Sequence, residues 1–129
     1  MFRSMRKHFL LFPLTAISML LLVMGCRSPQ VQTSVINSGN TPLHNVEVDY
    51  PSASFGTPTL DPGQVFHYQL QFRDAGQMKV QFFDNAHKLH SGTGPYAVEG
   101  QGGTLTLTLD GSGKNVWATD LRPQRNKPR

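Results

Sequence analysis

Residues 104–113 read TLTLTLDGSG, and this stretch decides the fold class. Its three leucines alternate with three threonines, so a β-strand here would turn leucine toward a core and threonine toward water. The DGSG that follows contains the residue types that favour tight turns. The stretch therefore predicts a half-buried strand that ends in a turn.

The same period of two recurs on the N-terminal side of this stretch. Val46, Val48 and Tyr50 alternate with acidic residues, and apolar residues alternate with His67 and glutamines over 66–72. Turn signals rich in Asn, Asp, Pro and Gly separate such segments. The expected strands are 31–37, 46–50, 66–72, 77–84, 86–91, 104–109 and 115–121. We therefore expect an all-β fold, a β-sandwich of about seven strands, as one domain over 31–121.

The segment GTGPYA at 92–97 matches the glycine string of a dinucleotide-binding loop. That motif must join a strand to a helix, and no window of this sequence has a convincing helical stripe. We expect a surface loop here and no cofactor.

Three quoted stretches resemble the strand pattern of bacterial immunoglobulin-like domains of the adhesion and cell-surface type: VINSGNTPLHNVEVDY at 35–50, LDPGQVFHYQLQF at 60–72 and GQMKVQFFD at 76–84. An Asn-x-Gly turn, a Val-x-Val strand and a Leu-x-Pro-Gly turn are their shared features. The resemblance implies a similar scaffold, an immunoglobulin-like β-sandwich, and leaves the activity open.

The N-terminus has the order of a signal peptide. Three basic residues precede an apolar run over 9–24. A transmembrane helix is the less favoured alternative, since the run is shorter than about 20 residues and contains Pro13. The LVMGC that follows at 22–26 resembles the lipobox of bacterial lipoproteins. We therefore expect an N-terminal signal helix within a leader over 1–25.

The lipobox resemblance implies that Cys26 carries the lipid, with 26–30 as lipidated cysteine and short tether. Two or three acyl chains hold a protein on a membrane where one would not. Cys26 is the single cysteine, so an intramolecular disulfide is excluded. Arg27 stands where inner-membrane lipoproteins commonly carry Asp, so the outer membrane is favoured over the inner membrane.

Charge argues against a nucleic-acid partner. The formal net charge is +4, but three of the twelve basic residues lie in the leader and four lie in 122–129, which we expect to be a basic disordered tail. Contact of that tail with an anionic lipid or polysaccharide surface is the alternative. The body between them is mildly acidic.

Histidines are the candidates for chemistry. His87 and His90 lie three apart, and on a strand that spacing points them to opposite faces. His67 is on another expected strand. We expect no catalytic site and no metal site, and predict a non-catalytic binding or structural module. The alternative is a periplasmic enzyme or metal-binding protein that uses His67, His87 and His90, and its sign would be two or more of them converging in a cleft.

Aromatic residues supply the candidate binding surface. Of the neighbours Phe82 and Phe83, one must face outward on a regular strand. An outward Phe83, with Tyr96 and Trp117, would suit an envelope protein or a glycan partner. The alternative is that these rings close the ends of a small core.

Overall fold

The computed structural model describes residues 29–123, so the leader, Cys26 and residues 124–129 lie outside the described part. Eight strands and no helix make up this part. The strands are β1 (Val31–Asn37), β2 (Leu43–Tyr50), β3 (Ala53–Leu60), β4 (Val65–Leu70), β5 (Gly76–Phe83), β6 (Leu89–Ala97), β7 (Gln101–Leu109) and β8 (Asn115–Pro123). The prediction of an all-β fold is confirmed, with one strand more than expected.

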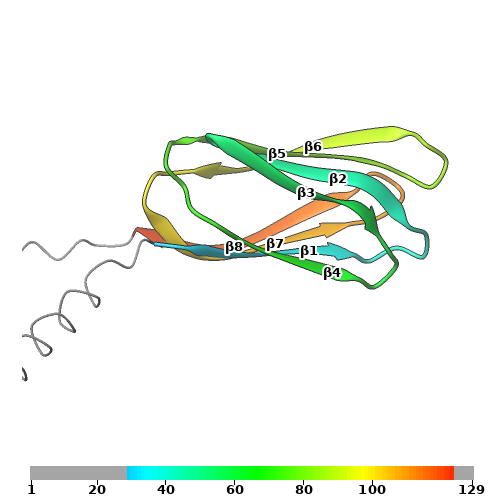
Figure 1. Cartoon of the computed structure of the whole chain (residues 1–129), viewed down its shortest axis with the longest axis horizontal. Coiled ribbons are helices and arrows are strands. Elements are labelled where there is room, and N and C mark those ends of the chain that lie inside the picture. Colours follow the sequence, from blue (N-terminus) through cyan, green and yellow to red (C-terminus); the bar gives the residue numbers. More distant parts are fainter. Residues whose placement is uncertain (1–28, 124–129) are drawn as a thin grey trace, which may run out of the picture.

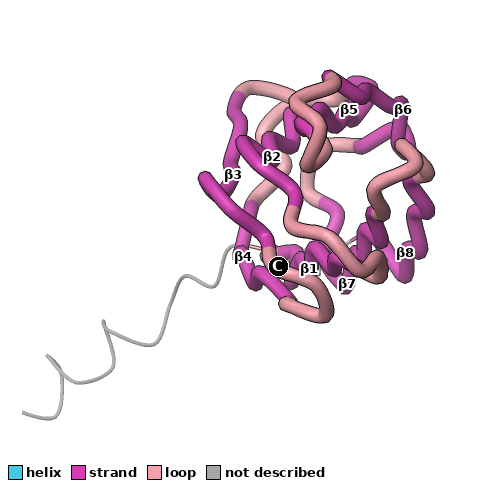
Figure 2. The backbone as a smooth tube through the Cα atoms, turned by 90° about the vertical axis from the view of Figure 1, so that its right-hand side faces the viewer, coloured by secondary structure: helices cyan, strands magenta, loops and turns pink. Residues whose placement is uncertain are grey.

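The strands form two four-stranded sheets that face each other (Figures 1 and 2). One sheet has the order β4-β1-β7-β8 and the other β3-β2-β5-β6. The β1–β7 pair is parallel, and the other pairs are antiparallel. This is the two-layer architecture of immunoglobulin-like sandwiches. Antibody constant domains divide seven strands four to three, whereas these eight divide evenly.

Strand β3 is the element that the sequence did not predict. Gly56 and Pro58 interrupt its alternation, and its burial pattern is irregular. It lies at the edge of its sheet, where a missing backbone donor is tolerated. A strand of this kind is recognisable only once its position in the sheet is known.

Strand β6 corrects a second expectation. The segment 92–97, expected to be a loop, forms the C-terminal part of this strand. Its register against β5 shifts between Gln77 and Lys79, so a bulge accommodates the interruption by glycines and Pro95. At the other end of the chain, β8 includes Arg122 and Pro123, two residues that the sequence analysis assigned to the tail.

The core lies between the sheets and follows the alternation read from the sequence. Leu105, Leu107 and Leu109 are at most 1% exposed, as the opening stretch predicted. Buried side chains from six other strands, β1 to β6, join them in one hydrophobic cluster. Phe82 belongs to this core and is fully buried, whereas Phe83 is half-buried.

The two open sides of the sandwich are closed differently. On one side, β3 lies over β4 (Figure 2), and the ring of Phe55 stacks on Tyr68 with centroids 4.3 Å apart. On the other side, β6 lies over β8, and the indole of Trp117 covers Gly94. A methyl group on Gly94 would lie 2.7 Å from that ring, so only glycine permits this approach. His90 is likewise accommodated against Gly113 of the β7–β8 turn.

Both ends of the described chain lie at one end of the sandwich. Gly103 of β7 pairs with Val31 on one side and with Leu121 on the other. The start of β1 and the end of β8 are therefore neighbours, as Figure 1 shows. We call this the terminal end. The loops 38–42, 61–64, 84–88 and 110–114 lie at the opposite end.

Candidate binding surface

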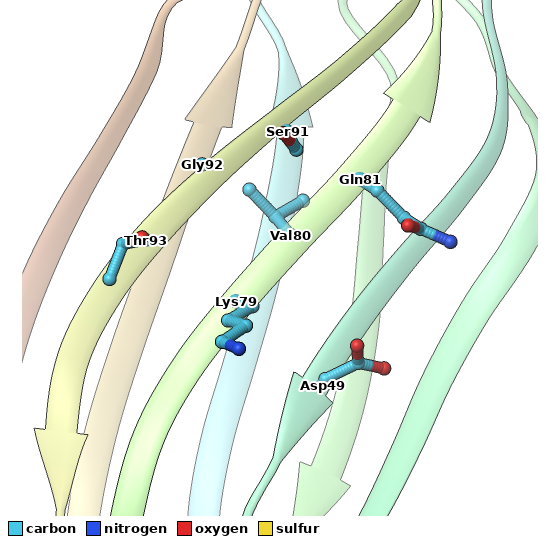
Figure 3. A pocket seen from close by; sticks show the side chains of 7 residues that line it. All are labelled: Asp49, Lys79, Val80, Gln81, Ser91, Gly92 and Thr93. Atoms are coloured by element: carbon cyan, nitrogen blue, oxygen red, sulfur yellow. The ribbon is translucent and has the colours of Figure 1, made fainter.

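The outer face of β2, β5 and β6 carries a shallow polar cavity. Alternation along the strands turns Val80 into the core and its neighbours Lys79 and Gln81 outward. The cavity has a volume of about 290 Å³, and Figure 3 shows its lining. The polar side chains that line it are Asp49, Lys79, Gln81, Ser91 and Thr93. They offer ionic, amide and hydroxyl groups on one face.

Charges on this face are arranged across neighbouring strands. Asp49 is opposite Lys79, and Glu47 is opposite Gln81. Opposite charges in such positions stabilise a sheet. Asp49 raises the pKa of the Glu47 carboxyl, first through a side-chain hydrogen bond and then through charge repulsion, while a hydrogen bond with Gln81 opposes the shift. The two carboxyl groups therefore lie close together beside the cavity.

Two of the three predicted aromatic residues lie at the ends of this face. Tyr96 is 61% exposed and is opposite Gln77, whereas Phe83 is half-buried and is opposite Leu89. Six positions on β5 separate these two pairs, which corresponds to about 20 Å along the strand. Lys79 lies between them, so the polar cavity is flanked by an aromatic ring at either end.

Trp117 is separated from the other two rings. It is half-buried on β8, in the sheet that does not contain β5 and β6, where it packs against the core and is opposite Leu107 of β7. Its Nε1 donates a hydrogen bond to Oδ1 of Asn115 at 3.0 Å. Its indole closes the β6–β8 side, so Phe83, Tyr96 and Trp117 do not share one surface.

Phe83 also lines a second cavity, at the opposite end from the termini. This cavity has a volume of about 370 Å³ and is lined by His44, Asn45, Pro58, Phe83 and His87. The rings of His44 and His87 are stacked with centroids 6.4 Å apart. Asn45 and His87 both have positive φ, at 46° and 62°, which Asn and His adopt more readily than most residues.

His44 is a cavity residue that the sequence did not predict. A register shift between His44 and Glu47 changes the direction of the strand at this point. A glycine often marks a bulge or a positive φ in a sequence. Neither the bulge at His44 nor the positive φ of His87 is marked in that way. The expected strand 86–91 included His87, whereas in the structure β6 begins at Leu89 and His87 lies in the preceding turn, where its backbone N–H donates to the carbonyl oxygen of Asp84 at 3.0 Å.

The three predicted histidines lie in different places. His67 is exposed on β4, with Nδ1 3.1 Å from Oγ of Ser34. His87 is in the β5–β6 turn. His90 is half-buried on β6 and stacks on Phe82, with ring centroids 5.3 Å apart. Within residues 29–123 they do not converge in one cleft, which was the sign set for the enzymatic alternative. That part of the chain also has no group of three His, Cys, Asp or Glu suited to a metal ion.

His90 has a structural partner in Asp84. Its Nε2 donates to Oδ2 of Asp84 at 2.8 Å, and the other carboxylate oxygen accepts from the backbone N–H groups of Ala86 and Lys88. These bonds, led by the one from His90, lower the pKa of the Asp84 carboxyl. The cluster fixes the β5–β6 turn in place.

Comparisons with known proteins bear on the fold. No protein-family model matches the chain, and no curated protein matches it. Among solved structures, it is similar to an NMR structure of a protein from Eubacterium rectale, with a TM-score of 0.52 and 14% identity over 81% of this chain and the whole of that one. At this identity the likeness concerns the fold alone. In the described range, no helix has the length and apolar character needed to span a membrane.

Proposed function

We propose that the chain is a bacterial envelope lipoprotein, anchored through a lipidated Cys26 and favouring the outer membrane, whose sandwich is a non-catalytic binding module. The observation that carries the binding role is the outer face of β2, β5 and β6, where Phe83 and Tyr96 flank a polar cavity. Aromatic rings supply much of the contact energy in protein interfaces, and their flat faces also suit stacking on other rings.

The shape of this face favours an extended ligand. Sites for small molecules are typically concave and mostly apolar. Here the cavity is shallow and polar, and its flanking rings are about 20 Å apart along β5. A glycan chain or an extended segment of an envelope protein would contact both rings and the polar groups between them.

The proposed anchor would limit the ligand to the membrane vicinity. Four residues lie between Cys26 and Val31, and the five Cα-to-Cα steps reach about 17 Å when extended. Confinement at this distance raises the effective concentration of nearby partners, so modest affinity is sufficient.

Substitution of the two rings tests the binding face. Phe83→Ala and Tyr96→Ala, each checked for folding, should lower the recovery of partner proteins or glycans by crosslinking in intact cells. Val116→Ala, an exposed apolar position on the other sheet, is the matched control. Unchanged recovery with both folded ring variants would contradict the assignment of this face. Hydrolytic activity that disappears on changing His67, His87 or His90 would replace it with the enzymatic alternative.

The anchor has a separate test. Cys26→Ser should abolish lipidation and leave either unprocessed precursor or protein released from the membrane, as judged by mass and membrane fractionation. Ser28→Ala is the neighbouring control and should be lipidated normally. A Cys26→Ser chain of mature length that stays membrane-bound would show that the lipobox interpretation is wrong.

A further inference from the structure

Strand β8 lies at the margin of its sheet (Figure 2), and its outer edge is the least protected of the four sheet edges. An edge strand presents unpaired backbone groups, which proteins usually protect by short length, proline, lysine or a bulge. β3 contains Gly56 and Pro58, β6 contains Pro95 and a register shift, and β4 has six residues. β8 has nine residues, which pair with β7 at every position without a shift, and its one proline comes last.

Within the part of the chain that the structure describes, no strand pairs with the outer edge of β8. β6 contacts the inner face of β8, where Trp117 covers Gly94, but forms no ladder with it. The backbone groups along this edge therefore have no partner strand. A strand from another molecule could add to the sheet here by the same pairing that joins β7 to β8.

The side chains of β8 also leave this edge incompletely covered. Trp117 and Leu121 point toward the core and pack against it, yet both are only half-buried. Thr119 lies between them on the same face and is exposed. On the outer face, Asp120 and Arg122 have opposite charges and are paired, with Nε 3.3 Å from Oδ1. An added strand would therefore cover apolar surface without meeting a net charge.

We infer that β8 pairs with β8 of a second copy of this chain, antiparallel and across a two-fold axis, so that two four-stranded sheets become one continuous sheet. Opposite residues of an antiparallel pair point to the same face, so the register can change only in steps of two. An axis at Thr119 pairs all nine residues of each strand. Thr119 then faces its own counterpart, and Trp117 faces Leu121 of the second copy. The inference requires neither the proposed anchor nor the proposed binding face.

Charge excludes the neighbouring registers. A shift by one step in one direction sets Asp120 opposite Asp120 of the second copy, and a shift in the other direction sets Arg122 opposite Lys114. Like charges directly opposite each other destabilise a sheet. Larger shifts leave only about half of each strand paired. The central axis instead sets Asp120 opposite Ala118. It sets Arg122 opposite Val116, so no like charges face each other.

This pairing leaves the proposed binding faces uncovered. The axis is perpendicular to the joined sheet, so the outer faces of β3-β2-β5-β6 in the two copies point to the same side. The terminal ends of the two copies lie at opposite ends of the dimer, because the two β8 strands are antiparallel. A long ligand with repeated units would contact both faces and gain affinity from the second contact.

The test traps the dimer covalently, because an interface made by one strand edge is small and exchanges quickly. Two differently tagged forms of the full chain, one with Val116→Cys and the other with Arg122→Cys, are co-expressed, and intact cells are treated with a thiol oxidant. Opposite Cα atoms of an antiparallel pair lie about 5 Å apart, which suits a disulfide. Both positions are exposed and the pairing uses backbone groups, so fold and dimer should be preserved. A disulfide-linked dimer that carries both tags is expected.

Val116→Cys combined with Ala118→Cys is the matched control. In the proposed register these two positions lie about 13 Å apart along the strands, too far for a disulfide. This pair should give little linked dimer. The same holds for either variant combined with the wild type, whose only thiol is that of Cys26. Circular dichroism of the purified variants checks that each is folded.

Thr119 allows a test by charge. With the cysteine pair at 116 and 122 in place, Thr119→Lys in one chain and Thr119→Glu in the other should favour linkage. They should give about fivefold more linked dimer than Thr119→Lys in both chains or Thr119→Glu in both, because the two residues face each other.

Equal linkage in the matched and control pairs, or no linkage of the folded variants at 116 and 122, would overturn the inference. So would linkage that does not depend on the charges at 119. Linkage of these cysteines to a different protein would also overturn it, since the edge would then accept another partner strand in place of a second copy.

Discussion

Asn37 is a polar side chain with no exposed surface, and its hydrogen bonds explain why it is buried. Nδ2 donates to the carbonyl oxygens of Thr41 and Leu60 at 2.8 and 2.9 Å, and Oδ1 accepts from the backbone N–H of Gly39 at 2.9 Å. One amide thus joins the end of β1 to the following loop and to the end of β3 in the other sheet. A buried polar group with these partners stabilises a connection that apolar packing cannot specify.

Asn37→Ala is expected to lower the free energy of unfolding by about 3 kcal/mol, since it leaves buried backbone groups without partners. Urea denaturation followed by circular dichroism measures this loss. Asn40→Ala, at an exposed position of the same loop, should change stability by less than about 0.5 kcal/mol. Equal effects of the two substitutions would mean that the hydrogen bonds of Asn37 contribute nothing net.

Asp84 gives a prediction about pH. Hydrogen bonds, first from His90 and then from the backbone of Lys88, lower the pKa of its carboxyl in the folded state. The ionised form is therefore favoured by folding, and its contribution is complete above an unfolded pKa of about 3.9 and is lost as the pH falls below it. Asp84→Asn should thus be less stable than the wild type at about pH 6, and the difference should shrink toward about pH 2.

Urea unfolding at the two pH values measures that difference. Asn85→Ala changes an exposed, uncharged residue of the same turn and should leave the pH dependence of stability as it is in the wild type. A gap between Asp84→Asn and wild type that stays constant with pH would argue against the role of the carboxylate.

At the scale of elements, the edge strands β6 and β8 pack against each other through a glycine on one and a tryptophan on the other. Gly94 removes a side chain from β6, and Trp117 of β8 fills the space with its indole. Neither residue would stabilise its strand by itself. Glycine weakens a strand interior, and an indole gains stability only when it packs against other atoms. Together they close one side of the sandwich.

Trp117→Ala should therefore destabilise the fold by about 2 kcal/mol, below the usual cost for a fully buried ring. Tyr96→Ala, on the outer face of β6, removes a 61% exposed ring and should change stability by less than about 0.5 kcal/mol. Circular dichroism during urea denaturation is the suitable measurement. Trp117 is the sole tryptophan, so its substitution removes the tryptophan fluorescence that would otherwise report unfolding. Similar stability of the two variants would contradict the structural role of the indole.

Elements with one buried and one wet face were predictable from the sequence. The alternation in 104–109 gave β7, and the expected 31–37 coincides with β1. β3 and the second half of β6 escaped prediction, since glycine and proline within them are ordinary loop signals. Edge strands tolerate these residues, and which strands lie at an edge is a property of the whole sheet.

The candidate surface was predictable only in part, for a related reason. The alternation of side chains along a strand indicated that Phe83 and Phe82 face opposite sides, and the structure agrees. This alternation does not indicate whether a side chain near the edge of a sheet packs against the core, as Trp117 does. His44 required a bulge to reach His87, and the sequence contains no distinct signal for that bulge.

At the scale of the whole molecule, the outer face of β3-β2-β5-β6 and the terminal end are different surfaces. The face between Phe83 and Tyr96 runs along the strands, whereas the described chain begins and ends at one end of them. Membrane attachment and ligand binding, as proposed, would therefore not compete for the same residues. Variants of one surface should leave the other unaffected, which makes the two proposals separable by experiment.

The position of β1 has a mechanical consequence. This strand continues into the tether and is paired along its length with β4 on one side and β7 on the other. Tension applied between residue 30 and the loops at the opposite end would act along β1 and load the hydrogen bonds of both ladders in shear. In single-molecule pulling from Ser112, rupture should need more force through residue 30 than through residue 123, because β8 has one neighbour. With the proposed anchor at Cys26, the sandwich would resist unfolding when a bound partner is pulled away from the membrane.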